Sequence, residues 1–175
     1  MVRGNKVGLR PVQRLDLPVL EAWINDPLYN SEYNDFGFQY TGQLAAQFDK
    51  DGLLDARGGA LIVFELEAEE IIGSVSYHQA VYGPNEGSRP YNIGVTLVPK
   101  QRGKGYGVEA QRLLADYLLA TYPVMRIEAA TDVTNLAEQR ALEKAGFTRE
   151  GVARQAQWRK GSWHDLVFYS KLRGE

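Results

Sequence analysis

A glycine-rich turn in the middle of the chain constrains the fold more than any other segment. Residues 102–107 read RGKGYG; they follow the apolar residues 91–98 and precede a segment with a helical period. The apolar positions of that period, spaced by three or four residues, are Ala110, Leu113, Leu114, Tyr117 and Leu118. Glycines let a backbone approach an anion, and a helix start offers unpaired N–H groups and a positive dipole end. The strand, turn and helix therefore predict a phosphate site, to which Arg102 and Lys104 add charge.

The spacing of the glycines separates three interpretations of this turn. A dinucleotide fingerprint has the spacing G-x-G-x-x-G at the first strand-to-helix turn, whereas Gly103, Gly105 and Gly107 are spaced G-x-G-x-G in mid-chain. A P-loop has four residues between its glycines and then Lys-Ser or Lys-Thr, a pattern that is absent here. The third interpretation is the pattern Arg-x-x-Gly-x-Gly, formed by Arg102, Gly105 and Gly107. The turn could also be a tight connection between a strand and a helix that binds no ligand.

Hydrophobic patterning and turn residues predict the remaining elements. Strands are expected at residues 7–12, 60–66, 71–81, 91–98, 124–131, 147–154, 156–159 and 164–172. Helices are expected at residues 15–25, at 41–49 with Thr41 as the cap, after the glycine turn, and at 135–145. Residues 30–40 and 82–90 are expected to be loops. This order predicts a mixed α/β (α+β) fold in one domain over residues 1–175, with most neighbouring strands joined by hairpins.

Composition excludes several classes of function. A net charge of −2 over 175 residues argues against a general nucleic-acid binder, which carries a basic excess. The absence of cysteine excludes disulfides and thiolate chemistry, and with only two histidines we expect no metal site. The apolar runs are far shorter than a membrane span and no apolar leader begins the chain, so we expect a cytoplasmic protein without membrane contact.

Two further blocks resemble the GNAT acyltransferase superfamily, whose acetyl-CoA signature contains Arg-x-x-Gly-x-Gly. Residues 135–147, NLAEQRALEKAGF, are similar to its N-x-A-x-x-x-x-x-E-K-x-G-F block, and residues 20–27, LEAWINDP, resemble the start of its RimJ/RimL-like branch. The resemblance implies a mostly antiparallel sheet flanked by helices, in which the central strands at 91–98 and 126–131 splay apart. It also implies an N-acetyltransferase that moves an acetyl group from acetyl-CoA to a primary amine without a metal.

The resemblance implies where CoA binds. The pantetheine arm would lie between the splayed strands and pair with the backbone of Val95 and Leu97. The glycine turn would hold the pyrophosphate through backbone N–H groups, and Lys104 and Arg140 would approach the phosphates. N–H groups near residues 95–97 would stabilise the oxyanion. The full implied set is Val95, Leu97, Arg102, Gly103, Lys104, Gly105, Tyr106, Gly107, Asn135 and Arg140.

The block at residues 135–147 also has an interpretation without a ligand. Asn135 and Glu138 stand at the Ncap and N3 positions of the expected helix and can form a capping pair. For Asn135, capping and contact with pantetheine both stay open. For Glu138 we favour capping, because a carboxylate beside a leaving thiolate is unfavourable unless it is protonated. Gly146 is expected to end the helix, with Phe147 as its apolar contact.

The resemblance leaves the catalytic groups unassigned. Many GNAT enzymes have a glutamate or histidine on the strand before the glycine turn, and a tyrosine late in the following helix. Residues 91–97 contain neither Glu nor His, and Leu142 stands near the tyrosine position. The catalytic candidates are therefore Tyr91, Asn92 and His78, although His78 is equally explained as a solvent-facing strand residue. The substrate-binding candidates are Trp23, Tyr33, Asp35 and Glu86, whose acidic members could attract a cationic amine.

The acceptor is expected to be a protein N-terminal amine, as the RimJ/RimL-like resemblance implies. A small amine, such as an aminoglycoside or a polyamine, is the alternative. The missing base and tyrosine also leave open a CoA-binding regulator without turnover. The size of the acyl group stays open, and a homodimer is among the assemblies that we expect.

Overall fold

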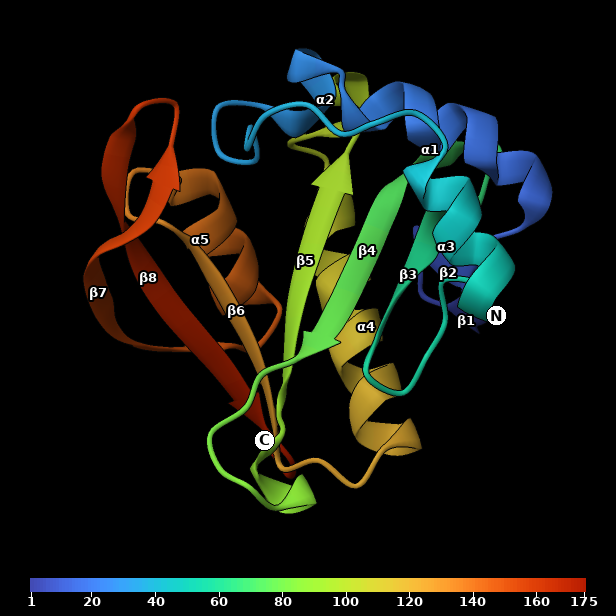
Figure 1. Ribbon diagram of the computed structural model, residues 1–175. Coiled ribbons are helices and arrows are strands. Elements are labelled where there is room, and N and C mark those ends of the chain that lie inside the picture. Colours follow the sequence, from blue (N-terminus) through green and yellow to red (C-terminus); the bar gives the residue numbers. More distant parts are fainter.

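A single sheet of eight strands organises residues 1–175, all of which this computed structural model describes. In spatial order the strands are β1 (Val2–Arg3), β2 (Val7–Pro11), β3 (Gly58–Glu65), β4 (Ile71–Gln79), β5 (Tyr91–Leu97), β6 (Arg126–Asp132), β8 (Ser162–Leu172) and β7 (Thr148–Arg159) (Figure 1). All neighbours are antiparallel except β5 and β6, which run parallel. The predicted mixed, mostly antiparallel sheet is confirmed.

Helices cover both faces of this sheet. They are α1 (Leu17–Ile24), α2 (Pro27–Asn30), α3 (Gln43–Asp51), α4 (Tyr106–Thr121) and α5 (Leu136–Lys144), with 3-10 turns η1 (Arg14–Asp16), η2 (Glu86–Ser88) and η3 (Pro99–Gln101). Figure 1 shows α4 behind β4 and β5, whereas α1 and α3 lie on the other side, over β2 and β3. None of the helices has the length and apolar composition that crossing a lipid bilayer requires.

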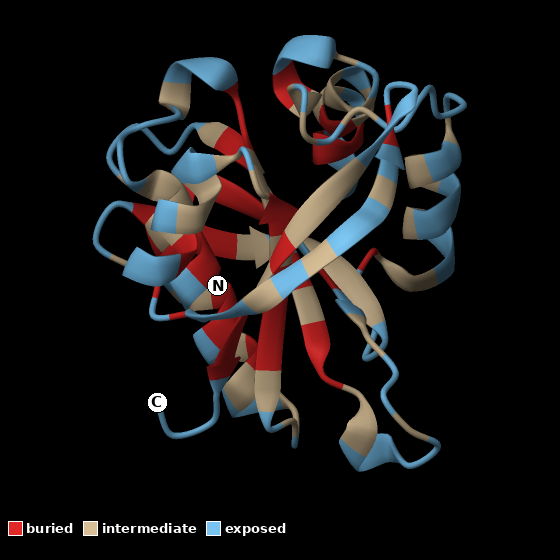
Figure 2. Ribbon diagram, turned by 90° about the vertical axis from the view of Figure 1, so that its left-hand side faces the viewer, coloured by how far each residue is buried: buried red, intermediate tan, exposed pale blue.

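Two apolar clusters fill the space between the sheet and its helices. The larger, of 23 buried residues, joins Ala110, Leu114 and Leu118 of α4, each 0% exposed, to the central strands. The smaller, under α1 and α3, is Val12, Leu17, Leu20, Leu53, Ile62 and Phe64. Figure 2 shows burial concentrated at the centre of the sheet. Each fully buried leucine contributes about 1.5–3 kcal/mol, so this packing holds α4 and the turn before it in place.

The N-terminal helices differ from the prediction in two places. α3 begins at Gln43 after Gly42, whose φ is 89°, so Thr41 does not cap it. At Pro27, where we predicted only the end of a helix, α2 begins, and Asp26 Oδ1 accepts a hydrogen bond from Leu28 N at 2.8 Å. Proline suits the first position of a helix, because the N–H that it lacks would have no helical partner there.

The two extended segments predicted at 147–154 and 156–159 form one interrupted strand, β7. Its register against β8 shifts between Ala153 and Gln157, and Gln155 has a φ of 50°. Such an irregularity bends a strand and redirects its side chains. Beyond it, Arg159 reaches Asp132 at the end of β6.

Candidate active site

The central strands β5 and β6 separate along their length. They pair only at Tyr91 with Ile127 and at Asn92 with Glu128. From Ile93 to Leu97, β5 has β4 on one side and no strand on the other. Figure 1 shows the two strands opening toward the end of the molecule where α2 lies. The predicted splay is confirmed, and it leaves one edge of the β5 backbone free.

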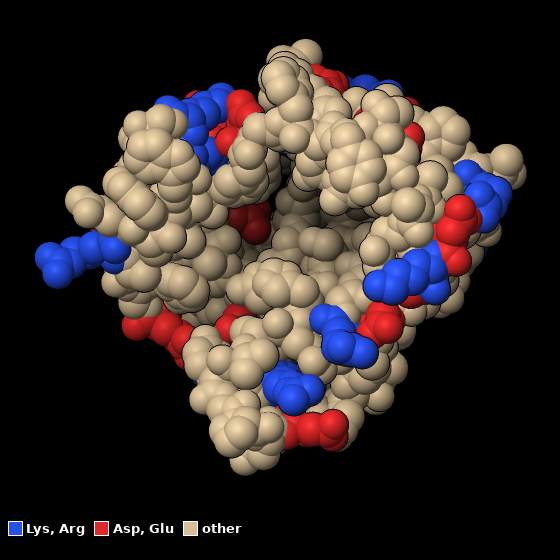
Figure 3. Space-filling view, viewed as in Figure 1, with Lys and Arg blue, Asp and Glu red and all other residues tan.

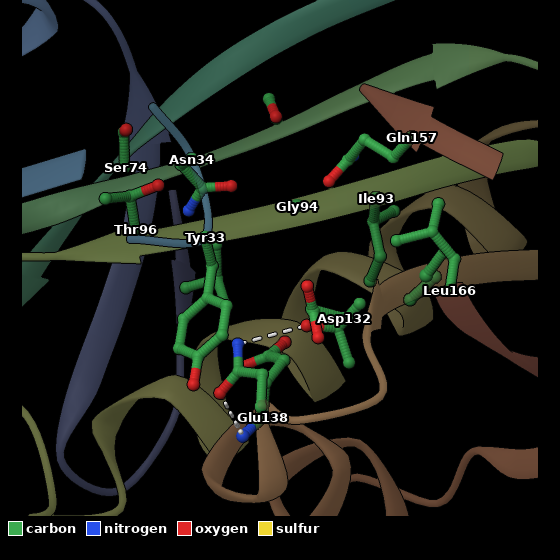
Figure 4. Close-up of a pocket in the computed structure, with 16 residues that line it drawn as sticks. Tyr33, Asn34, Ser74, Ile93, Gly94, Thr96, Asp132, Glu138, Gln157 and Leu166 are labelled. Carbon is green, nitrogen blue, oxygen red and sulfur yellow. Dashed lines mark hydrogen bonds between the residues drawn. The ribbon is translucent and has the colours of Figure 1, made fainter. Parts of the chain in front are cut away.

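Two adjoining depressions occupy this gap. The first, which we call the inner cavity, has a volume of about 210 Å³ and lies between β4, β5 and β6. Its lining residues are Tyr33, Asn34, Ser74, Ser76, Ile93, Gly94, Val95, Thr96, Ala129, Ala130, Thr131, Asp132, Asn135, Glu138, Gln157 and Leu166 (Figure 4). Figure 3 shows the hollow from outside, with an acidic side chain in its depth.

The second depression, the outer cleft, has a volume of about 460 Å³ and runs between the glycine turn and α5. Its lining residues are Tyr29, Ser31, Tyr33, Asn34, Val95, Thr96, Leu97, Arg102, Gly103, Gly105, Gly107, Val108, Asn135, Ala137, Glu138, Arg140, Ala141 and Lys144. Six residues line both depressions: Tyr33, Asn34, Val95, Thr96, Asn135 and Glu138. The cleft and the cavity therefore meet at these six residues.

The glycine turn has the geometry of an anion site. Gly103 and Gly105 have φ angles of 77° and 85°, a region that favours glycine. Gly105 is the N-cap of α4, and no side chain caps the helix there. The first N–H groups of α4 consequently have no side-chain acceptor, and the positive end of the helix dipole lies at the turn.

Two cations of this turn make hydrogen bonds with other parts of the chain. The Arg102 guanidinium donates to the Leu97 carbonyl at 3.0 Å, and to the carbonyls of Leu28 and Tyr29 at 2.9 and 2.6 Å. Arg102 therefore fastens α2 to β5, and it also lines the outer cleft. Lys104 lines neither depression, and its Nζ donates to Gln101 Oε1 at 2.7 Å.

Two other cations face the outer cleft from α5. Arg140 and Lys144 lie one helical turn apart, both line the cleft, and neither is in an ion pair within the chain. Arg140 was predicted and Lys144 was missed, although the spacing of four residues on a helix places both on one face. Tyr106, which was also expected to bind CoA, packs against the core and lines neither depression.

Asn135 and Glu138 do not form the predicted reciprocal pair. Asn135 Oδ1 accepts a hydrogen bond from Glu138 N at 3.3 Å, and its Nδ2 donates to Thr131 Oγ1 at 3.0 Å. The Glu138 carboxylate instead accepts a hydrogen bond from Gln111 Nε2 of α4. Burial raises the pKa of this carboxyl to about 7, and the bond from Gln111 offsets that effect only in part. Capping is thus confirmed for Asn135 and wrong for the Glu138 side chain.

An ion-pair network closes the inner cavity beside β6. Asp132 pairs with Arg159 and, at 2.9 Å, with His164 Nδ1, and it accepts hydrogen bonds from Thr134 N and Oγ1 at 2.8 and 2.7 Å. Burial alone would raise the pKa of Asp132, but the bonds from Thr134 and Arg159 lower it to about 2. The negative charge of Asp132 is therefore already balanced by a buried cation.

The loop at residues 31–35 contacts the same network and the residue next to it. The Arg159 guanidinium lies over the Tyr33 ring, 5.9 Å from its centroid, and Lys160 pairs with Asp35 at 3.2 Å. Figure 4 shows Tyr33 and Asn34 on the opposite side of the cavity from Gln157 and Leu166. Tyr33 lines both depressions, as expected of a substrate contact, whereas Asp35 lines neither.

Three predicted site residues lie outside the inner cavity. Tyr91 is 1% exposed, and its hydroxyl donates to the Ala56 carbonyl at 2.5 Å, so it is a core residue. Glu86 lies in η2, which Figure 1 shows at the end of the molecule opposite α2. Trp23 stacks on Tyr29 with 4.7 Å between the ring centroids, and it reaches the cleft only through that neighbour.

His78 and Asn92 occupy facing positions on β4 and β5. They lie two residues along their strands from the cavity-lining pair Ser76 and Gly94. Because side chains alternate along a strand, the two pairs are on the same face of the sheet. Neither lines the cavity, so their catalytic role stays a prediction. No cluster of three or more histidine and acidic side chains is placed to hold a metal ion.

Comparison with known proteins identifies the family. The family description "Acetyltransferase (GNAT) domain" matches residues 6–148. The probable N-acetyltransferase YjcK of Bacillus subtilis (strain 168) is 38% identical over 103 residues, which are 59% of this chain and 55% of that protein. The match therefore spans little more than half the length of YjcK.

Two solved structures share the fold. Spermidine N-acetyltransferase from Vibrio cholerae, in complex with CoA and spermine, has a TM-score of 0.81 and 20% identity, and 95% of each chain is covered. RimL, a ribosomal alpha-N-protein acetyltransferase in complex with coenzyme A, has a TM-score of 0.80 and 19% identity, with 97% of this chain and 95% of that chain covered. Because the family match spans most of the sequence and the folds agree, this chain belongs to the GNAT acetyltransferase family.

Proposed function

We propose that this protein transfers an acetyl group from acetyl-CoA to a primary amine. The observation that carries the proposal is the free edge of β5, which runs from the inner cavity into the outer cleft. A pantetheine arm suits such an edge, because its amides can bond a strand backbone as an added strand does. The Leu97 carbonyl already accepts from Arg102, so Val95 is the proposed pairing position.

The phosphate end of CoA is proposed to lie at the glycine turn. The N–H groups that follow Gly103 and Gly105 would hold the pyrophosphate, because a helix start attracts anions. Arg140 and Lys144 are close enough along α5 to bind the same or the neighbouring phosphates. Asn135 lines both depressions, so it would contact the arm between them.

The thioester would then sit where the cleft and the cavity meet. Backbone N–H groups of β5 near Val95 and Thr96 would stabilise the oxyanion that forms when the amine attacks. The amine would enter through the inner cavity, one wall of which is formed by Tyr33 and Asn34. Acyl transfer by this route needs a neutral amine and a proton for the departing thiolate.

We propose a protein N-terminal amine as the acceptor. An α-amino group has a pKa of about 7.7–8.0, whereas an alkyl ammonium such as that of lysine has one of about 10.4. An α-amine is therefore partly neutral near pH 7 without a strong base. This suits a cavity whose two carboxyl groups are Asp132, which is paired with Arg159, and Glu138, whose pKa burial raises to about 7. A polycation would also gain little from a carboxylate that is already neutralised.

A polyamine is the second candidate, because one structural relative is a spermidine N-acetyltransferase in complex with spermine. Isothermal titration with acetyl-CoA tests the donor, and absence of binding at millimolar concentration would overturn the proposal. CoA release would then be measured with a lysine-free peptide, an Nα-blocked lysine peptide, spermidine and an aminoglycoside. We expect the lysine-free peptide to be the best acceptor. Binding of acetyl-CoA without release for any amine would identify a CoA-binding regulator instead.

A further inference from the structure

We propose that Glu138, in its neutral form, is the acid that protonates the sulfur of CoA as the thiolate leaves. This inference rests on the proposed transfer from acetyl-CoA. It concerns a residue that the sequence pattern favoured only as a helix cap and that the fold places elsewhere.

Position is the first argument. If the donor lies in the outer cleft and the amine enters through the inner cavity, the reacting carbonyl lies at the six residues common to both. Among these six, Val95, Thr96, Asn34 and Asn135 carry no group that titrates near neutral pH. Only Glu138 and Tyr33 remain as proton donors at this junction.

The neighbour of Glu138 is the second argument. Gln111 is 1% exposed, and while its Nε2 donates to Glu138, its Oε1 is buried without a hydrogen-bond partner. An unpaired buried acceptor costs about 1–3 kcal/mol. A neutral Glu138 has a hydroxyl that can donate to an amide oxygen, whereas a carboxylate has none. The orphaned oxygen therefore favours the protonated acid, which is the form that can give up a proton.

The surrounding charges agree with this assignment. The other ionisable groups that line the same depressions are Tyr29, Tyr33, Arg102, Asp132, Arg140 and Lys144. Arg102 is occupied by three carbonyls and Asp132 by Arg159. Glu138 is in no ion pair, so burial dominates and raises its pKa to about 7.

The proposed step conserves protons. The amine nitrogen bonds to the thioester carbon, and the carbon–sulfur bond then breaks with its electron pair on sulfur. Glu138 gives its proton to this sulfur and becomes a carboxylate. The proton that the nitrogen loses returns to Glu138 through solvent in the inner cavity, so the acid is ready for another turnover. General acid catalysis of this kind contributes about 10²–10⁴-fold to a rate.

The test is Glu138→Gln, which keeps the shape but has no acidic proton. We expect kcat to fall by about 100-fold or more, with the KM for acetyl-CoA within about twofold of its original value. The matched control is Glu143→Gln, on the exposed side of the same helix, which should leave kcat unchanged. Since the acid must be protonated, wild-type kcat should decline as pH rises through about 7, and this decline should vanish in Glu138→Gln.

Two further readouts decide between outcomes. Carbon-13 NMR of glutamate-labelled protein should show one carboxyl that titrates near pH 7 and that is missing in Glu138→Gln; titration near pH 4.5 would overturn the inference. If the fall of kcat with rising pH persisted in Glu138→Gln and vanished in Tyr33→Phe, the acid would be Tyr33 rather than Glu138. Unchanged kcat in Glu138→Gln would overturn this inference alone. A wild-type protein that releases no CoA with any amine would overturn the proposed function as well.

Discussion

The outer cleft and the inner cavity differ in how the chain builds them. The phosphate end of the cleft is built by one short segment, in which Gly103 and Gly105 turn backbone N–H groups toward a helix start, and by one face of α5; residues 29–34 and β5 form its other walls. The cavity collects side chains from β4, β5, β6, β7, β8, α5 and the loop at residues 31–35. We therefore expect the backbone anion site to tolerate distant changes better than the cavity, which depends on long-range contacts. The following variants test that difference, beginning with the largest expected effect.

Asp132→Asn should damage the inner cavity most. It leaves the buried Arg159 without its charge partner, and breaking a buried pair in this way costs about 3–5 kcal/mol of unfolding free energy. Chemical denaturation measures the loss. Asp49→Asn is the control, because its pair with Arg14 is exposed and should contribute less than about 1 kcal/mol.

The same pair predicts a dependence of stability on pH. The folded-state pKa of Asp132 is lowered to about 2 from an ordinary value of 3.8. Its contribution is therefore fully present above the ordinary value and is lost as pH falls through the folded value. Between pH 3.8 and about 2, the unfolding free energy of wild type should therefore fall more steeply with decreasing pH than that of Asp132→Asn. Identical dependence of the unfolding free energy on pH in the two proteins would contradict the role of this pair.

Gly105→Glu should damage the outer cleft instead. A side chain at a φ of 85° costs about 1–3 kcal/mol, and a carboxylate repels a phosphate, so acetyl-CoA affinity should fall about 100-fold. Isothermal titration measures this loss. Gly87→Glu provides the same substitution in η2, with open space around the added Cβ and no positive φ, and should bind acetyl-CoA as wild type does.

Arg140→Ala should have a smaller effect that is confined to the cleft. Loss of one phosphate contact should weaken acetyl-CoA binding about tenfold and reduce its sensitivity to salt, with kcat nearly unchanged. Arg149→Ala, on the exposed part of β7, is the control cation. A fall in kcat rather than in affinity would place Arg140 in the chemistry and weaken the separation of the two regions.

Tyr91→Phe should have the smallest effect. It removes the hydrogen bond to the Ala56 carbonyl and should cost about 1 kcal/mol of stability, without a change in kcat. Thermal unfolding and steady-state kinetics measure the two quantities. A large fall in kcat at unchanged stability would restore Tyr91 as a catalytic candidate.

The parts of the site that the sequence predicted are those that short segments specify. The glycine turn and the capping of α5 by Asn135 follow from spacing within one element and its ends, whereas the family resemblance implied the position of Arg140. The contacts of Arg102 with the carbonyls of residues 28 and 29 were not predicted, because these partners are far away in the chain. The contacts of Arg159 and Lys160 with the loop at residues 31–35 also join distant parts of the chain, and the sequence did not predict them for the same reason.

Glu138 shows most plainly what the sequence determined and what only the tertiary structure decided. Its place at N3 of a helix, the glycine turn and the apolar stripe of α4 follow from local propensity and hydrophobic period, and the resemblance of sequence blocks implied the GNAT fold. Its proton affinity does not, because that depends on Gln111 from another helix and on burial by elements that are distant in the sequence. Local patterns set where the backbone goes, and burial among distant neighbours sets which side chain can hold a proton.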